Sequence, residues 1–172
     1  MFEVVFGAAG SGKSEYAETL ACALAGGKER RYYIATMLPY GEEGRRRIER
    51  HRQLRSGKGF ETIEQQFNIS EALEKIEAPD SSTLLIECMS NLVSNEMFIG
   101  DGKTEKIFEE CRTIIEKCSN IVIVTNDVFS DGCLYSSEMR AYIERLADIN
   151  RRLFEIADGV TESVYSVPLK WK

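Results

Sequence analysis

The sequence has 172 residues, a formal net charge of −6, a hydrophobic fraction of 43% and a charged fraction of 29%. These values are ordinary for a globular protein, and the length predicts a single domain over residues 1–172. The acidic balance argues against nucleic-acid binding, and no apolar run approaches the about 20 residues of a membrane span. Because the N-terminus shows no secretion signal, we expect a cytoplasmic protein.

The cysteine and histidine content of the chain limits which metal sites and disulfides we expect. The five cysteines have no C-x-x-C spacing, and His51 is the single histidine. A zinc site is therefore disfavoured. We expect reduced thiols, mostly as small core residues, rather than a disulfide framework.

The first half of the chain alternates short apolar runs with helical periodicity. One of its helices falls within Glu42–Lys58, which carries seven Lys/Arg and three Glu, a local charge of +4 in an acidic chain. In chain order the pattern predicts a strand over Phe2–Phe6, a helix over Gly12–Leu24, a strand over Arg31–Thr36, a helix over Glu42–Ser56, a strand over Phe60–Glu64 and a helix over Ser70–Ile76 that Ser70 caps.

The second half continues the alternation and contains the longest helical pattern. The predicted elements are a strand over Thr83–Glu87, helices over Cys88–Phe98 and Lys103–Cys118, a strand over Asn120–Thr125, a loop over Asn126–Tyr135, a helix over Ser137–Ala157, a strand over Gly159–Tyr165 and a short tail at Pro168–Trp171. In the longest helix the residues expected to face the core are Met139, Ile143, Leu146, Ile149, Leu153 and Ile156.

Apolar strands that alternate with helices predict an α/β fold in three layers. Right-handed crossovers make such a sheet mostly parallel, with helices on both faces. Ligands of these sheets bind beyond the carboxyl ends of the strands. The candidate loops are therefore those that follow Phe6, Thr36, Glu87 and Thr125.

The segment after the first strand fits G-x-x-x-x-G-K-[ST], the phosphate-binding loop. It comprises Gly7, Ala8, Ala9, Gly10, Ser11, Gly12, Lys13 and Ser14. Glycines let backbone N–H groups surround an anion, and the following helix points its positive end at the phosphates. Lys13 can reach the β- and γ-phosphates, and the Ser14 hydroxyl can ligate Mg²⁺. The segment predicts binding of a nucleoside triphosphate; a chance glycine-rich turn is the alternative.

Polar residues end two further strands at the same edge of the predicted sheet. Glu87 ends the apolar run TLLIE, where an acidic residue in a phosphate-loop protein helps to hold Mg²⁺, directly or through water. The alternative is a solvent-exposed carboxylate at a strand end. Asn126 and Asp127 end the run NIVIVT and could contact substrate or metal, or could simply form a turn.

His51 lies within a run of arginines on the predicted basic helix. Arg47 and Arg55 are four residues to either side of it and therefore share its face. Nearby cations favour the neutral imidazole, which is the nucleophilic form, and the arginines can neutralise a polyphosphate. A histidine that attacks a nucleotide α-phosphate fits this arrangement, whereas spacing alone favours a histidine on a solvated basic helix.

The motifs together resemble one family along essentially the whole chain. The most specific is R-I-x-x-H-R-x-x-R at Arg47–Arg55, followed by T-I-E at Thr62–Glu64. The other matching stretches are FGAAGSGKSEYAE, YYIAT, LLIECMSNLVSNEMF, IVIVTND, RAYIERLADINRRLFEIADGV and PLKWK. The chain thereby resembles the bifunctional adenosylcobinamide kinase/adenosylcobinamide-phosphate guanylyltransferases of cobalamin assembly.

The resemblance implies two reactions in one domain. The loop would bind ATP or GTP with Mg²⁺ and pass the γ-phosphoryl group to adenosylcobinamide. The histidine that aligns with His51 would then attack the α-phosphate of GTP, expel pyrophosphate and pass GMP to adenosylcobinamide phosphate. The implied fold is a RecA-like P-loop NTPase with an antiparallel strand near the C-terminus, and the implied assembly is a homotrimer with its active site near a subunit interface.

The resemblance also assigns roles to individual residues. It implies that His51 and Lys13 are catalytic, that Ser14 and Glu87 hold the metal, and that Asn126 and Asp127 bind substrate. The residues expected to bind the nucleotide, besides the loop itself, are Arg47, Arg52, Arg55, Glu64 and Glu87.

The chain departs from the family pattern mainly after Thr125. Glu87-Cys88 stands where Asp-Cys is common, and Phe60 precedes Glu61 where the family has Trp. The family's S-N-E-V-G is T-N-D-V-F here, and its G-I-V-P is G-C-L-Y. These changes place the substrate-facing loop, rather than the nucleotide core, in question.

Two other functions remain open from the sequence. One is a P-loop small-molecule kinase without guanylyl transfer, and the other is a nucleotide-dependent switch whose arginine helix binds a partner. The chain lacks an N-K-x-D guanine-specificity motif, so the sequence leaves ATP and GTP open as the phosphoryl donor.

Overall fold

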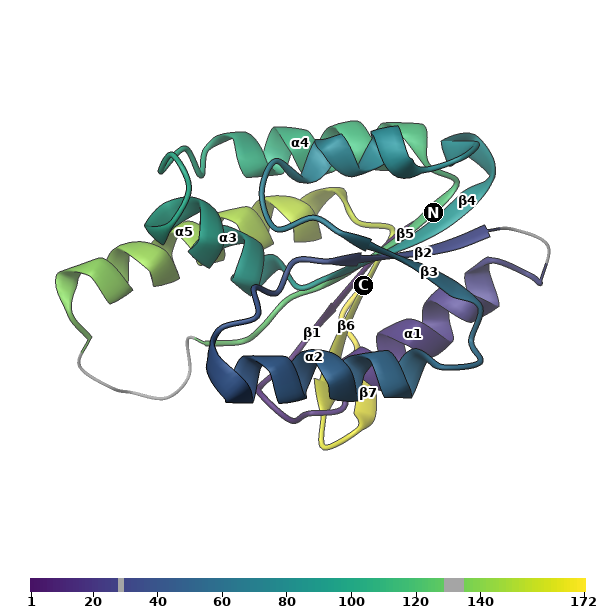
Figure 1. The fold of residues 1–172 in the computed structure, drawn as a ribbon, viewed down its shortest axis with the longest axis horizontal. Coiled ribbons are helices and arrows are strands. Elements are labelled where there is room, and N and C mark those ends of the chain that lie inside the picture. The colour runs from purple at the N-terminus through teal and green to yellow at the C-terminus, as the bar shows by residue number, and fades with distance from the viewer. Residues whose placement is uncertain (28–29, 129–134) are drawn as a thin grey trace.

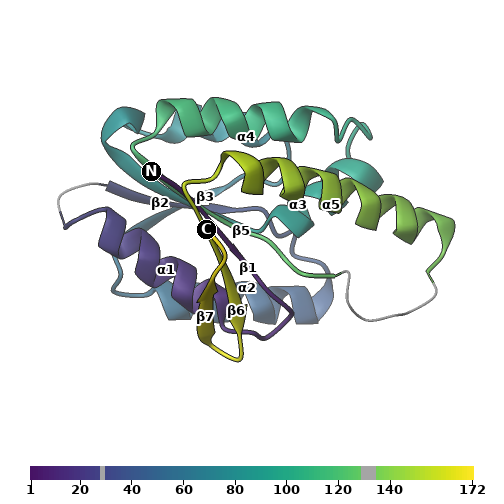
Figure 2. The same cartoon turned by 180° about the vertical axis from the view of Figure 1, so that it is seen from behind.

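A single twisted sheet with helices on both faces organises the chain (Figure 1, Figure 2). The computed structural model describes residues 1–27, 30–128 and 135–172, without the side chains of Glu43, Arg47 and Leu54. In these ranges seven strands pair in the order β3-β2-β4-β5-β1-β6-β7. All pairs are parallel except β6 with β7. The predicted α/β fold with a mostly parallel sheet is confirmed.

The elements alternate along the chain much as the sequence predicts. The strands are β1 (Phe2–Phe6), β2 (Arg30–Ala35), β3 (Phe60–Glu64), β4 (Ser82–Glu87), β5 (Asn120–Val124), β6 (Gly159–Val164) and β7 (Val167–Lys170). The α-helices are α1 (Lys13–Leu24), α2 (Gly41–Arg55), α3 (Met89–Phe98), α4 (Lys106–Lys117) and α5 (Ser137–Ile156). Two 3₁₀ helices cover Ile69–Lys75 and Pro79–Ser81.

Alternation along the buried strands divides the core between the two faces of the sheet. On β4, Leu84 and Ile86 pack toward the face that α3, α4 and α5 cover, whereas Leu85 packs toward α1. Both layers are visible in Figure 1, with α1 and α2 on the opposite side from the other helices. Because β1 lies between β5 and β6, the loop that follows it sits near the middle of the sheet edge.

Two element predictions near Ser70 and Pro168 were wrong. The helix predicted over Ser70–Ile76 is a 3₁₀ helix that begins after Asn68, whose φ of 45° is left-handed, so Ser70 lies inside it and caps nothing. The tail predicted at Pro168–Trp171 is largely strand β7. Proline is tolerated there because β7 is an edge strand with one hydrogen-bonded neighbour.

The core face of α5 is shorter than its apolar periodicity predicts. Leu146, Ile149 and Leu153 are buried, but Met139 is 40% and Ile156 45% exposed. Met139 lies in the first turn of the helix and Ile156 in its last, and the N-terminal end of α5 extends past the sheet (Figure 1). The helix therefore buries its middle turns only. Within the described ranges, no helix is long and apolar enough to cross a membrane.

Thr36 ties the carboxyl ends of β2 and β4 together. Its backbone N–H donates to the carbonyl of Glu87 over 3.1 Å. Its buried hydroxyl accepts from the N–H of Cys88 over 2.7 Å and donates to the Cys88 carbonyl over 2.9 Å. Asn95 of α3 donates to the Thr36 carbonyl over 2.8 Å. This network fixes the backbone that carries Glu87.

Replacing the Thr36 hydroxyl should destabilise the fold. The substitution Thr36→Val keeps the side-chain volume but removes the hydroxyl. The buried N–H and carbonyl of Cys88 then lose a hydrogen-bond partner, which should lower the free energy of unfolding by about 1–3 kcal/mol. Urea unfolding measures the loss. The matched control is Thr19→Val on the exposed face of α1, where the hydroxyl also bonds to a backbone carbonyl; equal losses in the two variants would contradict the role given to Thr36.

Candidate functional site

The helix that follows the phosphate-binding loop, α1, begins without a side-chain cap among the described residues. Gly12 is the N-cap of α1, with φ of 86°, and no described side chain caps the helix by a hydrogen bond. Lys13 is buried and donates from Nζ to the carbonyl of Ala8 over 3.0 Å, so it lies over its own loop. Uncapped N–H groups at a helix start form an anion site, and Lys13 adds a cation to it.

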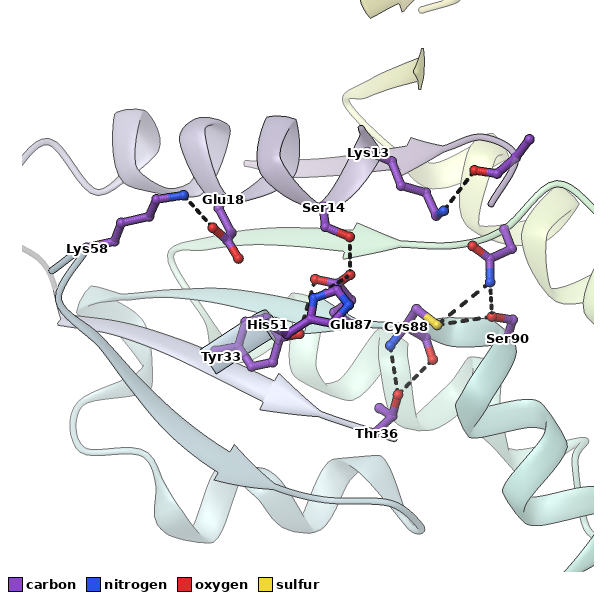
Figure 3. Close-up of polar contacts among 12 residues, drawn as sticks. Lys13, Ser14, Glu18, Tyr33, Thr36, His51, Lys58, Glu87, Cys88 and Ser90 are labelled. Carbon is purple, nitrogen blue, oxygen red and sulfur yellow. Dashed lines mark hydrogen bonds and ion pairs between the residues drawn. The ribbon is translucent and has the colours of Figure 1, made fainter. Parts of the chain in front are cut away.

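The buried carboxylate of Glu87, at the end of β4, collects groups from three elements (Figure 3). Ser14 of α1 donates from its hydroxyl to Oε1, and Tyr33 of β2 donates to Oε2 over 3.1 Å. His51 of α2 places Nδ1 at 3.8 Å from Oε1. Burial, and then the charge of Glu87, raises the pKa of Tyr33 well above its usual range, so Tyr33 remains a hydrogen-bond donor. The interpretation of Glu87 as a solvent-exposed strand end is wrong.

His51 lies in the pocket rather than on a solvated helix face. Its side chain is 17% exposed, and it lines a pocket together with Lys13, Ser14 and Glu87. Its Nδ1 is on the side of the Glu87 carboxylate. The neutral imidazole predicted from the neighbouring arginines stays a prediction.

Arg55 stacks on an aromatic ring next to His51. Its guanidinium carbon lies 3.4 Å from the centroid of the Tyr33 ring, and the side chain is 7% exposed. Its Nη1 is buried and has no hydrogen-bond partner within the described ranges. A desolvated guanidinium with a spare donor in a pocket suits a phosphate oxygen.

The remaining predicted nucleotide residues are Arg52, Glu64 and Arg47. Arg52 and Glu64 form an ion pair of 3.1 Å, with both side chains more than 40% exposed, and Glu64 also lines the pocket. Arg47 belongs to α2, but its side chain lies outside the described part of the structure. Arg55 is thus the predicted arginine that the structure places in the pocket.

Asn126 lines two cavities, and Asp127 lines the second of them. Asn126 lines the same pocket as His51, and its Nδ2 donates to the hydroxyl of Ser90 over 2.6 Å. Asp127 lines a second, more open cavity beside Phe6 and Phe154, and its N–H donates to the Gly7 carbonyl over 3.0 Å. The part of the predicted loop over 129–134 lies outside the described residues.

Sequence reasoning missed Tyr33 and Asn91 as members of the pocket. Tyr33 occurs in RRYYIA, where strand periodicity marks it only as a core residue. One signal was present, because β2 is a strand whose carboxyl end reaches the same sheet edge as the loop. Asn91 lies in the first turn of α3, four residues after Glu87, and its Nδ2 is buried without a partner among the described residues.

The residues present fit a magnesium ion bound together with a nucleotide. The described part of the chain holds no group of three His, Cys, Asp or Glu side chains that could bind a metal by itself. Magnesium in nucleotide sites takes most of its ligands from phosphates and water, so two protein oxygens suffice. The Ser14 hydroxyl and the Glu87 carboxylate are adjacent and supply them.

A buried ion pair anchors the C-terminal end of α2 to α1. Lys58, just after α2, places Nζ at 2.5 Å from Oε2 of Glu18, which is 1% exposed. This pair, together with Arg55 on Tyr33, fixes the half of α2 that carries His51.

Breaking that pair from one side should destabilise the protein. Lys58→Met leaves the buried Glu18 carboxylate without its cation, and because Lys58 is one-third exposed we expect a loss of about 1–3 kcal/mol in urea unfolding. The double variant Lys58→Met/Glu18→Leu should recover most of it. The control Lys103→Met removes an exposed ion pair to Asp101 and should cost less than about 0.5 kcal/mol. A double variant as unstable as Lys58→Met would contradict this account.

Solved structures resemble this fold at low sequence identity. The KaiC-like protein PH0186 from the hyperthermophilic archaeon Pyrococcus horikoshii OT3 is 15% identical, with a TM-score of 0.53 over 94% of this chain and 69% of that chain. The ATP synthase subunit NeqB from Nanoarchaeum equitans is 13% identical, with a TM-score of 0.55 over 94% of this chain and 46% of that chain. At these identities the likeness shows the fold alone, which is the RecA-like P-loop fold.

Sequence comparison gives a more specific result. A search of curated proteins gave no match. A family model described as cobinamide kinase/cobinamide phosphate guanyltransferase matches residues 3–171. Because this match covers nearly the whole chain, the chain belongs to the cobinamide kinase/cobinamide phosphate guanyltransferase family.

Proposed function

We propose that the chain phosphorylates adenosylcobinamide and then transfers GMP from GTP to adenosylcobinamide phosphate through a guanylyl group held covalently on His51. The observation that carries the proposal is the meeting of His51 with the phosphate loop at Glu87, where Nδ1 lies 3.8 Å from the carboxylate that also bonds Ser14. A histidine on the solvent-exposed face of a basic helix would not be expected to lie next to this carboxylate.

In the guanylyl half of the reaction, Nε2 of His51 attacks the α-phosphorus of GTP. The new bond is P–N, the broken bond is that to the α–β bridging oxygen, and pyrophosphate leaves with the bonding electron pair. The ring gains positive charge as the bond forms. Glu87, on the Nδ1 side, stabilises that charge, and Nε2 is the nitrogen that attacks. A phosphate oxygen of adenosylcobinamide phosphate then attacks the same phosphorus and breaks the P–N bond.

In the kinase half, the loop holds the triphosphate while its γ-phosphoryl group passes to the acceptor hydroxyl. The α1 N-terminus and Lys13 bind the phosphates, and Asn126, in the same pocket, is placed to bind the acceptor. Magnesium held near Ser14 and Glu87 would neutralise charge on the β- and γ-phosphates. Arg55 offers its spare Nη1 to a phosphate oxygen in either half.

Assembly as a homotrimer, which the family resemblance implies, and residence in the cytoplasm are further parts of the proposal. Light scattering of the purified chain measures the first of these directly.

The covalent step predicts a specific label. The wild-type chain incubated with GTP labelled at the α-phosphate should retain acid-labile label, and His51→Ala should lose it while still phosphorylating adenosylcobinamide. Gln53→Ala, on the exposed side of the same helix, is the control and should label normally. The measurement is label retained on protein after gel filtration, beside γ-phosphoryl transfer.

Other outcomes separate the competing functions. A wild-type chain that binds GTP but never takes the label would leave a small-molecule kinase, whose γ-phosphoryl transfer survives His51→Ala. Nucleotide-dependent association with a partner and no turnover of any corrinoid would leave a switch protein. Lys13→Ala impairs all three functions, so it distinguishes none of them.

The metal role of Glu87 predicts a shift in magnesium dependence. Glu87→Gln keeps the shape but removes the charge, so half-maximal phosphorylation should need about 10-fold more Mg²⁺. Titration of kinase activity with MgCl₂ measures the shift. Glu116→Gln, on the exposed side of α4, is the control. An unchanged midpoint in Glu87→Gln would remove Glu87 from the metal site.

A further inference from the structure

The turn between β6 and β7 rests directly on the phosphate-binding loop. The N–H of Ser166 and the hydroxyl of Ser163 both donate to the Ser11 carbonyl over 2.7 Å. Gly12 leaves no room for a side chain, because a Cβ there would overlap Ser166. Figure 2 shows the hairpin beside the segment that joins β1 to α1. The hairpin therefore shapes one flank of the loop.

The turn presents an aromatic side chain that the fold does not use. Tyr165 is 92% exposed, so its ring packs on almost nothing within the chain. Tyr165 and Ser166 have φ of 48° and 63°, as a two-residue hairpin turn of type I′ requires. Glycine and asparagine suit such positions, whereas a bulky residue is strained there. A strained, fully exposed tyrosine points to a ligand contact rather than to folding.

The two ends of the loop differ in a way that orients a nucleotide. Ser14 and Glu87 mark the end that faces β4, and these are the groups suited to the metal that bridges the β- and γ-phosphates. The opposite end faces β6 and β7, because the strand order is β4-β5-β1-β6-β7 and the loop follows β1. A triphosphate with its γ-phosphate near Glu87 thus extends its nucleoside toward Tyr165.

The guanylyl step requires the nucleotide to lie in the opposite orientation along the phosphate-binding loop. His51 lies on the Glu87 side of the loop, so an α-phosphate within its reach puts the nucleoside on the α2 side, away from the hairpin. The pyrophosphate leaving group then occupies the loop. One anion site consequently serves two nucleotide orientations, and only one of them brings the base to the hairpin.

We propose that Tyr165 is a base-stacking platform for the phosphoryl-donor nucleotide and takes no part in guanylylation of His51. The inference rests on the proposed two-reaction function. An aromatic ring stacks on any nucleobase without reading its edge, so the platform fits a purine donor of either kind, ATP or GTP.

The test uses a variant that relaxes the turn while removing the ring. Tyr165→Gly should not lower the melting temperature, because glycine adopts positive φ without strain. It should raise the KM for the nucleotide in adenosylcobinamide phosphorylation about 10-fold, the loss expected from one stacked base, with kcat little changed. Tyr165→Trp should restore the KM. The rate of α-label transfer from GTP to protein should stay at the wild-type value in both variants.

Leu169→Ala is the matched control, since it removes an exposed apolar side chain from the same hairpin at a position that pairs with Glu162, outside the turn. A donor KM unchanged in Tyr165→Gly would overturn the platform. A slowing of α-labelling equal to the KM effect would overturn the two orientations. Absence of α-label in the wild type itself would remove the guanylyl half of the proposed function, and the donor KM would still decide on the platform.

Discussion

The candidate site depends on one buried carboxylate that side chains from three separate elements approach. The backbone at Glu87 is held in place by Thr36, which forms hydrogen bonds with the Glu87 carbonyl and with the N–H and carbonyl of Cys88. Its carboxylate lies next to Ser14 of α1, Tyr33 of β2 and His51 of α2. A buried negative charge without such partners would cost free energy. The contacts that stabilise the Glu87 carboxylate are therefore the same contacts that bring the pocket residues together.

Much of the fold could be predicted because hydrophobic periodicity records which faces are covered. The all-buried run of β4 and the nearly continuous buried run of β5 follow directly from a sheet covered on both sides. Periodicity does not record where the covered region ends, however. That is why Met139 and Ile156 were assigned to the core although they lie beyond it. The tail predicted at Pro168–Trp171 proved to be mostly an edge strand for a related reason, since pairing with β6 is not recorded in local periodicity.

The site was predictable where local sequence determines local geometry. The loop needs glycines and a helix start at fixed spacing, so Gly7–Ser14 could be recognised without a structure. His51 could not be placed from its neighbours. Its flanking residues indicate only that the helix is basic, whereas Glu87, which it approaches in the fold, is 36 residues away in the sequence. Tyr33 was missed for the same reason, because only the folded sheet shows that its hydroxyl and ring face Glu87 and Arg55.

The contact between Ser11 and Ser163 has a consequence for when the protein becomes active during its synthesis. The two residues are 152 positions apart, yet the loop takes its shape partly from the later one. Strand β1 also cannot be enclosed until β5 and β6 have been made, because it pairs between them. An N-terminal fragment on the ribosome therefore carries the complete phosphate-loop sequence without the surroundings that hold it. The complete surroundings of the loop therefore exist only once β6 has been made, although the loop residues themselves are among the first to be synthesised.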